Sequence, residues 1–301
     1  MAPSISVLIT NYNYARFLPA AVESVLAQTR PADEIVVVDD GSTDESLTVL
    51  QRDYGDRIRV VAKANGGQAS SFNAGAGVCS GDLICLLDAD DTWHPEKLAT
   101  VEGAFARVPD AAMLRHELRY LQPDGPRDGE LVLSLETQVH SRVVPERSLV
   151  DRRFAPTSAL TFPRWAWDRL LPLPEDTFRI SADGYLFVFA AMLGPMIDLA
   201  DVLADYRLHG ANNFVGAAGS AARVARIELA LLDELEARGF DPVVPHHVYR
   251  LLRTVETGSE LFRRRRRLRR VADAARGTGS PPRRLVHAVV ELVLPPVRPA
   301  A

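Results

Sequence analysis

The chain has 301 residues, of which 47% are hydrophobic and 25% are charged, as in an ordinary globular protein. Its formal net charge of -4 argues against a nucleic-acid binder driven by bulk charge. The two cysteines, Cys79 and Cys85, can form neither a zinc site nor a disulfide framework, and no apolar run is long enough to span a membrane. The first residues lack the features of a secretory signal, so we expect a cytoplasmic location.

The first hundred residues alternate between the patterns of buried strands and of amphipathic helices. Strands are predicted over residues 4–10, 34–38, 58–62 and 83–87, and helices over residues 15–28, 45–54 and 68–78. Continuous apolar runs, such as LICLL in the last of these strands, are typical of strands that are buried on both faces. The alternation predicts an α/β fold with a parallel, doubly wound sheet.

The pattern becomes less regular after a predicted helix over residues 95–108. We expect strands over residues 113–118, 131–135, 157–163 and 195–204, helices over residues 166–171 and 183–193, and a short helix with a loop over residues 143–154. The last third is interpreted as helices over residues 220–238, 245–275 and 283–294. We place the main domain boundary near residue 215, so that residues 216–301 form a helical C-terminal extension.

An acidic cluster follows the strand predicted over residues 83–87. Asp88, Asp90 and Asp91 place three carboxylates within four residues, where they repel one another. A hard divalent cation, which prefers oxygen ligands and leaves room for substrate phosphates, would hold them together. The alternative is an acidic turn in which Asp91 or Thr92 caps the next helix.

A second pair of carboxylates, Asp39 and Asp40, follows the second predicted strand. Because the ends of parallel strands meet at one rim of a sheet, we expect Thr10, Asp40 and Asp88 to line a single crevice together with Asp90. Carboxylates there suit ribose hydroxyls or the N–H of a pyrimidine base. The alternative for Asp39 and Asp40 is a plain turn.

Two phosphate-binding motifs are missing from the sequence. The turn after the first strand reads TNYNYA and lacks the glycine pattern of dinucleotide-binding folds. No Gly-Lys-Ser/Thr loop is present either. Any phosphate bound at this rim would therefore be neutralised by a metal ion rather than by a glycine-rich loop.

Four segments stand in an order and spacing that resemble a known family. They are ITNYNYARFLPAAVESVLAQT at 9–29, EIVVVDDGSTDES at 34–46, ANGGQASSFNAGAGVCSGDLICLLDADD at 64–91 and TWHPEKL at 92–98. Together they resemble the nucleotide-sugar-binding half of the inverting family 2 glycosyltransferases, closely over residues 4–101 and more loosely to about 213. The resemblance implies the A-type glycosyltransferase (GT-A) fold: a Rossmann-like, mostly parallel sheet flanked by helices, within a catalytic domain at residues 1–215.

The resemblance also implies site residues and a cofactor. In the family, the positions of Thr10 and Asp40 contact the nucleotide base, and the acidic motif contacts the ribose and holds Mn²⁺ or Mg²⁺ on the diphosphate. Phe72 stands where relatives usually carry an arginine. The implied nucleotide-sugar contacts are Thr10, Asn11, Tyr12, Asp39, Asp40, Asn65, Asn73, Asp88, Ala89 and Asp90, and the implied metal ligands are Asp90, Asp91 and His209.

Asp183 is the candidate general base. Inverting transfer needs a base that deprotonates the acceptor hydroxyl. In the family this base is the Asp of an acidic pair at the start of a helix, and Asp183 matches it, although Ala182 replaces the usual Glu. Two alternatives remain open: Asp183 is only a helix N-cap, or the base belongs to the acidic pair Glu175 and Asp176.

Two further features lie toward the C-terminus. Residues 206–209 read YRLH and match the segment that closes the catalytic half of many relatives, where the histidine approaches the metal or diphosphate; the alternative is a surface loop. The basic run 263–270 beside an amphipathic helix suits either an anionic membrane surface or a homo-oligomer contact. Its ordinary interpretation is a solvated helix end.

The expected activity is metal-dependent, inverting transfer of a sugar from a nucleoside diphosphate sugar to a hydroxyl acceptor, and the expected donor is a UDP-sugar. The acceptor would be a glycan, a lipid-linked glycan or a small molecule. A sugar-1-phosphate nucleotidyltransferase is the alternative enzyme, but it would need a glycine-rich basic loop after the first strand. A catalytically impaired nucleotide-sugar-binding or scaffolding protein is the alternative outside the enzymes.

Overall fold

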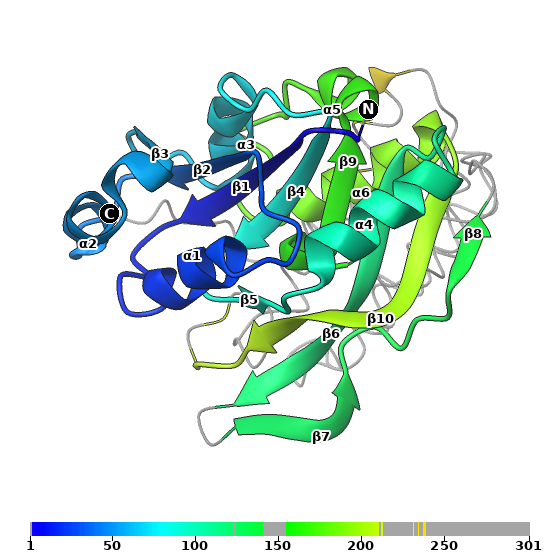
Figure 1. Ribbon diagram of the computed structural model, residues 1–301. Helices are drawn as coiled ribbons and strands as arrows, with labels where there is room; N and C mark the ends of the chain where they lie inside the picture. Colours follow the sequence, from blue (N-terminus) through cyan, green and yellow to red (C-terminus); the bar gives the residue numbers. More distant parts are fainter. Residues whose placement is uncertain are drawn as a thin grey trace, which may run out of the picture. The chain divides into compact units, whose positions relative to one another are not determined.

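The computed structural model describes residues 2–122, 125–140 and 155–210, with a few single positions up to 238 (Figure 1). The predictions for residues 143–154 and, apart from those single positions, for the helices beyond 215 lie outside the described residues. The chain divides into two compact units, residues 1–143 with 153–209 and residues 144–152 with 210–301. The first unit contains every element discussed below, and the boundary near 215 stays a prediction.

The first unit is built on a mixed sheet with the strand order β3-β2-β1-β4-β9-β6-β10-β5, to which β7 adds beside β6 and β8 beside β10. The strands are β1 Ile5–Asn11, β2 Glu34–Asp39, β3 Arg59–Ala62, β4 Leu83–Asp88, β5 Thr92–Trp93, β6 Met113–Gln122, β7 Gly125–Leu131, β8 Gln138–His140, β9 Leu160–Pro163 and β10 Met196–Arg207. The helices are α1 Leu18–Leu26, α2 Ser46–Asp53, α3 Gln68–Ala76, α4 Lys97–Arg107, α5 Arg164–Leu170 and α6 Ala182–Leu193, with single 3₁₀ turns at Gly55–Arg57 and Thr157–Ala159.

The N-terminal half of the sheet is parallel, as predicted. β1 pairs in parallel with β2 on one side and with β4 on the other. Leu8, Val37 and Leu86 are fully buried at its centre, because helices cover both faces: α1 and α4 lie in front of the sheet in Figure 1 and α6 lies behind it. This arrangement brings the carboxyl ends of β1, β2 and β4 to one rim, where ligands bind in open α/β sheets.

The C-terminal half of the sheet is mixed. β9 lies antiparallel between β4 and β6, and β10 runs parallel to β6. The long β10 then reaches β5, so that its end at Arg207 returns to the loop that follows β4. The segment just after β10 is therefore held near the acidic cluster.

Two local predictions are corrected by the structure. Residues 92–93 form the short strand β5 against β10, and the side chains of Asp91 and Thr92 cap no helix, because α4 starts at Lys97 after Glu96. The strand expected over residues 131–135 lies earlier, at β7, where it pairs with an extended β6. In both cases pairing with a distant strand decides the conformation.

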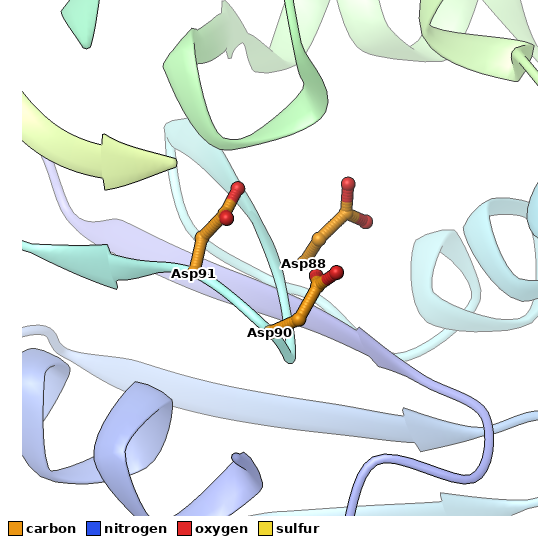
Figure 2. A group of neighbouring side chains, drawn as sticks. All are labelled: Asp88, Asp90 and Asp91. Atoms are coloured by element: carbon orange, nitrogen blue, oxygen red, sulfur yellow. The ribbon is translucent and has the colours of Figure 1, made fainter. Parts of the chain in front are cut away.

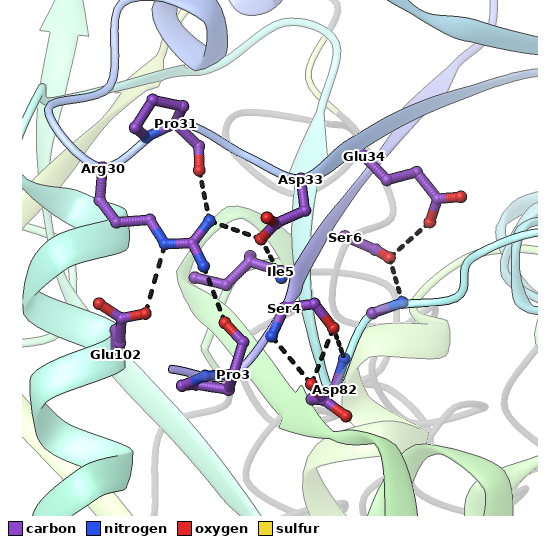
Figure 3. A network of polar contacts seen from close by, with 11 residues as sticks. Pro3, Ser4, Ile5, Ser6, Arg30, Pro31, Asp33, Glu34, Asp82 and Glu102 are labelled. Atoms are coloured by element: carbon purple, nitrogen blue, oxygen red, sulfur yellow. Dashed lines mark hydrogen bonds and ion pairs between the residues drawn. The ribbon is translucent and has the colours of Figure 1, made fainter. Parts of the chain in front are cut away.

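The opposite rim of the sheet is closed by a network of polar contacts (Figure 3). Asp33 accepts the backbone N–H of Ile5, and Asp82 accepts both the backbone N–H and the hydroxyl of Ser4. Arg30 joins Asp33 to Glu102 of α4. These contacts fix the amino ends of β1, β2 and β4 in register, so the carboxyl ends are fixed as well.

Candidate active site

The acidic cluster lies at the carboxyl end of β4. Asp88, Asp90 and Asp91 each offer a carboxylate oxygen, and these oxygens lie within 4.8 Å of one another. Figure 2 shows the three side chains projecting from the end of β4 and the turn after it toward a common space. Burial and the charge of Asp90 raise the pKa of Asp88 to about 7, and the same causes raise the pKa of Asp91 well above its usual range. The fold therefore concentrates negative charge that a bound cation would neutralise.

Asp91 is the most deeply held carboxylate of the cluster. Ser158 Oγ donates to Asp91 Oδ2 at 2.6 Å, and the backbone N–H of Arg207 donates to Oδ1 at 3.0 Å. The carbonyl of Ser158 in turn accepts Lys97 Nζ at 2.8 Å and Trp93 Nε1 at 3.1 Å. Asp91 is thus oriented by a buried layer behind the cluster.

Lys97 is a fully buried cation in that layer. Its Nζ lies 3.6 Å from the centre of the Trp93 ring, which gives it cation–π stabilisation. Burial lowers the pKa of Lys97 to about 7. The side chain therefore sits behind Ser158 as a donor to a carbonyl rather than as an exposed charge.

His209 approaches the cluster from the segment after β10. Its Nε2 lies 2.9 Å from Asp90 Oδ2, and the side chain is 4% exposed. The ring contacts Phe17 and Tyr14 in the loop before α1, with centroid separations of 4.8 and 5.4 Å. The guanidinium of Arg207 lies over the same Phe17 ring, and its Nε donates to the carbonyl of Asp90. The alternative of a free surface loop at residues 206–209 does not describe this packed segment.

Asp183 is connected to the cluster through Thr157. The hydroxyl of Thr157 interacts with both Asp183 and Asp88, and the charge of Asp183 contributes to the raised pKa of Asp88. Asp88 also accepts the Thr10 hydroxyl at 2.8 Å. The candidate base and the acidic cluster therefore border the same small region.

Asp183 is not the N-cap of α6. The N-cap position is Ser181, in a left-handed conformation with φ 66°, and Asp183 is the second helical residue. Its Oδ1 accepts the backbone N–H of Gly184 at 2.8 Å. Burial raises the pKa of Asp183 to about 6 despite these hydrogen bonds. The rival residues Glu175 and Asp176 are exposed.

The two carboxylates at the end of β2, Asp39 and Asp40, accept hydrogen bonds from the protein. Asp39 accepts Asn11 Nδ2 at 2.7 Å and the backbone N–H of Ser42 at 2.9 Å. Asp40 accepts Lys63 Nζ at 2.6 Å, the backbone N–H groups of Gly66 and Gly67 at 2.8 and 2.7 Å, and Asn65 Nδ2 at 3.2 Å. Asp40 thus organises the loop of residues 63–67.

The sequence of this chain matches a described family. The family model described as Glycosyl transferase family 2 matches residues 6–133. An uncharacterized glycosyltransferase of Nostoc sp. (strain PCC 7120) is 38% identical over 229 residues, covering 72% of this chain and 68% of that protein. This chain belongs to the family 2 glycosyltransferases. The chondroitin synthase of Pasteurella multocida (strain Pm70) is 35% identical over 125 residues, which are 41% of this glycosyltransferase and 13% of the synthase.

Solved structures show that this glycosyltransferase has the GT-A fold. The structure of S. aureus TarS residues 1–349 in complex with UDP-GlcNAc matches with a TM-score of 0.60 and 20% identity, covering 84% of this chain and 71% of that one. The same TarS fragment in complex with UDP gives a TM-score of 0.57. The fold and family expectations are therefore confirmed.

The glycosyltransferase brings most of its predicted site residues into two groups. The first is the cluster of Thr10, Asp88, Asp90, Asp91 and His209, which Asp183 borders. The second surrounds Asp40 and contains Asn11, Asp39 and Asn65. Three predicted residues lie in neither group. Ala89 is buried and donates its backbone N–H to the carbonyl of Thr10, and Tyr12 is 46% exposed. The Asn73 side chain hydrogen-bonds to Leu173 and Glu175. Their roles in nucleotide-sugar binding stay predictions.

The cluster suits the divalent cation that this family often uses. Its carboxylate oxygens are hard ligands of the kind that Mn²⁺ and Mg²⁺ prefer, and an imidazole beside them suits Mn²⁺. Burial and the neighbouring charge of Asp90 raise the pKa values of Asp88 and Asp91, so a cation bound beside them would favour their ionised forms. The donor set therefore fits a metal site.

Several residues of the site escaped the sequence analysis. Thr157 and Ser158 lie in a segment that reads only as a strand, and Lys97 reads as an ordinary residue of an amphipathic helix. Tyr14 lies in the loop after β1, where burial and the charge of nearby Asp90 raise its pKa. No pattern in a single sequence separates such residues from their neighbours.

Within the part of the chain that the structure describes, no helix has the length and apolar character needed to cross a membrane.

Proposed function

We propose that this glycosyltransferase transfers a sugar from a UDP-sugar to a hydroxyl acceptor with inversion at the anomeric carbon. The observation that carries the proposal is the acidic cluster with Asp183 beside it, joined through Thr157. The acidic cluster would serve the donor diphosphate, and Asp183 would serve the acceptor. The TarS structures that hold UDP and UDP-GlcNAc support UDP as the donor nucleotide.

In this proposal Asp90, Asp91 and His209 hold a Mn²⁺ or Mg²⁺ ion. The ion, when bound, neutralises the diphosphate and stabilises it as a leaving group. Ser158 and the backbone of Arg207 fix both oxygens of Asp91, and His209 fixes Asp90. The residues that hold the ion are thus oriented before any ligand arrives.

Asp183 acts as the general base on the acceptor side. The acceptor oxygen attacks the anomeric carbon, the bond from that carbon to the diphosphate oxygen breaks, and the acceptor proton passes to the Asp183 carboxylate. A pKa of about 6 leaves Asp183 largely ionised at neutral pH while keeping it basic enough to accept a proton. Transfer by a single displacement of this kind inverts the configuration.

The nucleotide would lie along the carboxyl ends of β1 and β2. Thr10 and Asn11 end β1 there, Tyr12 follows them, and Asp40 fixes the loop of residues 63–67. Because Asp40 already accepts four protein donors, we expect its main effect on the bound nucleotide base to pass through this loop.

An alternative within the family is a catalytically impaired nucleotide-sugar-binding or scaffolding protein. It is motivated by Ala182 and Phe72, which stand at positions where relatives carry Glu and Arg.

The test is UDP release with Mn²⁺ from UDP-GlcNAc, UDP-glucose, UDP-galactose and UDP-glucuronate. We expect the wild type to release UDP from at least one donor and Asp183→Asn to lose about 10²- to 10⁴-fold in rate. Asp176→Asn is the control and should behave as wild type. A dead Asp176→Asn beside an active Asp183→Asn would assign the base to Asp176, and UDP binding without release from any donor would favour the impaired protein.

We also propose a role for the C-terminal extension, residues 216–301. Its basic run at 263–270 and the amphipathic pattern after it suit a peripheral contact with an anionic membrane or with a second copy of the chain. The membrane contact would hold the enzyme at a surface where lipid-linked acceptors lie.

A further inference from the structure

Gln68 is the first residue of α3 and contacts the element that carries Asp183. Its Oε1 accepts the backbone N–H of Ala182 at 2.8 Å, and its Nε2 donates to the Thr157 hydroxyl at 2.8 Å. Ala182 directly precedes Asp183, and Thr157 interacts with the Asp183 carboxylate. One amide side chain therefore holds two of the immediate neighbours of Asp183.

The backbone around Gln68 strengthens the same junction. Its N–H donates to the carbonyl of Arg179 at 2.8 Å, and the next N–H, of Ala69, donates to the carbonyl of Phe178 at 3.2 Å. Gly67 has φ +87°, and a Cβ there would lie 2.5 Å from the Arg179 carbonyl oxygen. The chain before α6 and the start of α3 are thus in close contact, which a larger residue at position 67 would prevent.

The loop before Gln68 belongs to the proposed donor side. Gly66 and Gly67 donate their backbone N–H groups to Asp40, and Asn65 accepts Arg179 Nη2 at 2.7 Å. The loop of residues 63–67 is therefore bound at one end to the end of β2 and continues, through Gln68, to the start of α6. The donor side and the base share one hydrogen-bonded connection.

We propose that Gln68 is a positioning residue, which sets the place of the Asp183 carboxylate relative to the donor-binding loop. The inference rests on the proposed function, in which Asp183 is the base. A displacement of about 1 Å between base and reacting atoms costs on the order of 10²-fold in rate. Glutamine suits the task because its neutral amide offers an acceptor to Ala182 and a donor to Thr157 without adding a charge beside Asp183 and Asp88.

The chain contains a matched control for this residue. Gln28 is buried and also uses its amide to connect two segments: Nε2 donates to the carbonyls of Ser24 and His94, and Oε1 accepts the backbone N–H of Leu98. These bonds join the end of α1 to α4, and none involves Asp183. Gln28→Met and Gln68→Met therefore remove comparable hydrogen bonds at a structural site and at the proposed positioning site.

The experiment compares both variants by UDP release from the fastest of the four UDP-sugars with Mn²⁺, and by calorimetric UDP affinity. We expect Gln68→Met to lower kcat by about 10- to 100-fold while the Kd for UDP stays within about twofold, because only the base is displaced. Gln28→Met should lower the melting temperature but keep kcat within about twofold. Hydrogen exchange at the Ala182 amide should accelerate in Gln68→Met and stay unchanged in Gln28→Met.

A double-mutant cycle with Asp183→Asn separates positioning from general destabilisation. If Gln68 acts through Asp183, then Gln68→Met should cost less than about twofold in kcat once Asp183→Asn is present. Wild-type kcat in Gln68→Met, or a full additional loss in the double variant, would overturn the inference while leaving the proposed base intact. Full turnover of Asp183→Asn alone would instead refute the proposed base, and with it the positioning role.

Discussion

The hydroxyl of Ser158 lies 2.6 Å from Asp91 Oδ2 and donates its hydrogen to that carboxylate. The Ser158 hydroxyl oxygen also accepts the backbone N–H of Asp88 at 3.1 Å. Ser158 therefore connects the first and last members of the acidic cluster, and it belongs to the turn before β9 rather than to the β4 segment. A hydrogen bond from behind fixes the direction in which Asp91 presents its lone pairs, as outer-shell partners of metal ligands do.

Removal of this hydroxyl should weaken ion binding. Ser158→Ala should lower the apparent Mn²⁺ affinity, measured through Mn²⁺-dependent UDP binding, by about 10- to 100-fold. Ser24→Ala is the control. Ser24 lies in α1, and its Oγ accepts the backbone N–H of Trp93 in β5 at 3.1 Å. The control should keep its Mn²⁺ affinity. Equal losses in both variants would mean that Ser158 contributes only to folding.

Turnover should depend on the ionisation of Asp183. Burial raises the pKa of Asp183 to about 6, and only the carboxylate form can accept a proton. The rate at saturating donor should therefore rise about tenfold per pH unit below about pH 6 and level off above it. Rates of UDP release across this range measure the profile, with UDP affinity measured in parallel. A rate independent of pH on both sides of about 6 would argue against Asp183 as the base.

Thermal stability should respond to Mn²⁺ in a pH-dependent way. The pKa of Asp88 is raised to about 7 and that of Asp91 is raised well above its usual range, so the fold favours their protonated forms. The stability gained from those protons is present at low pH and is lost as the pH rises through about 7. An ion replaces the protons, and its binding to the folded state raises the melting temperature. We expect a larger rise with Mn²⁺ at about pH 8 than at about pH 5, and an equal rise at both would contradict the expectation.

The sequence predicts the parallel half of the fold because its signal is local. LICLL in β4 and EIVVV in β2 are apolar runs of strand length, and the acids that follow them mark the rim. The topology then places Asp88 and Asp40 at the ends of strands on either side of β1, as expected. Asp183 could be selected as a base candidate only with the help of the family resemblance.

The mixed half depends on distant pairing that no local pattern reveals. β5 is two residues long and exists through its pairing with β10, more than a hundred residues away. Ser158 and Thr157 gain their roles because β9 lies antiparallel to β4, which carries the turn before it to the acidic cluster. Gln68 reads as an unremarkable first residue of a helix until α6 is placed against it.

The C-terminal extension should be separable from nucleotide binding. Deletion of residues 277–301 should leave UDP affinity with Mn²⁺ unchanged, because the sheet and the acidic cluster lie within residues 5–209. Binding to anionic liposomes that disappears on deletion would support the membrane role, and a change from oligomer to monomer would support self-association. Full-length protein that neither binds such liposomes nor self-associates would refute both proposals.

The central claim is that the acidic cluster binds the donor diphosphate through a divalent cation. Calorimetry of UDP binding, in Mn²⁺ and in EDTA, tests it most directly with the wild type and with Asp90→Asn, a variant that keeps the side-chain size but removes the charge. The account predicts binding to the wild type that weakens by at least about tenfold in EDTA, and an Asp90→Asn variant whose affinity is low in both conditions. UDP binding of equal strength with and without the metal ion, or an Asp90→Asn variant that retains Mn²⁺-dependent binding, would contradict it.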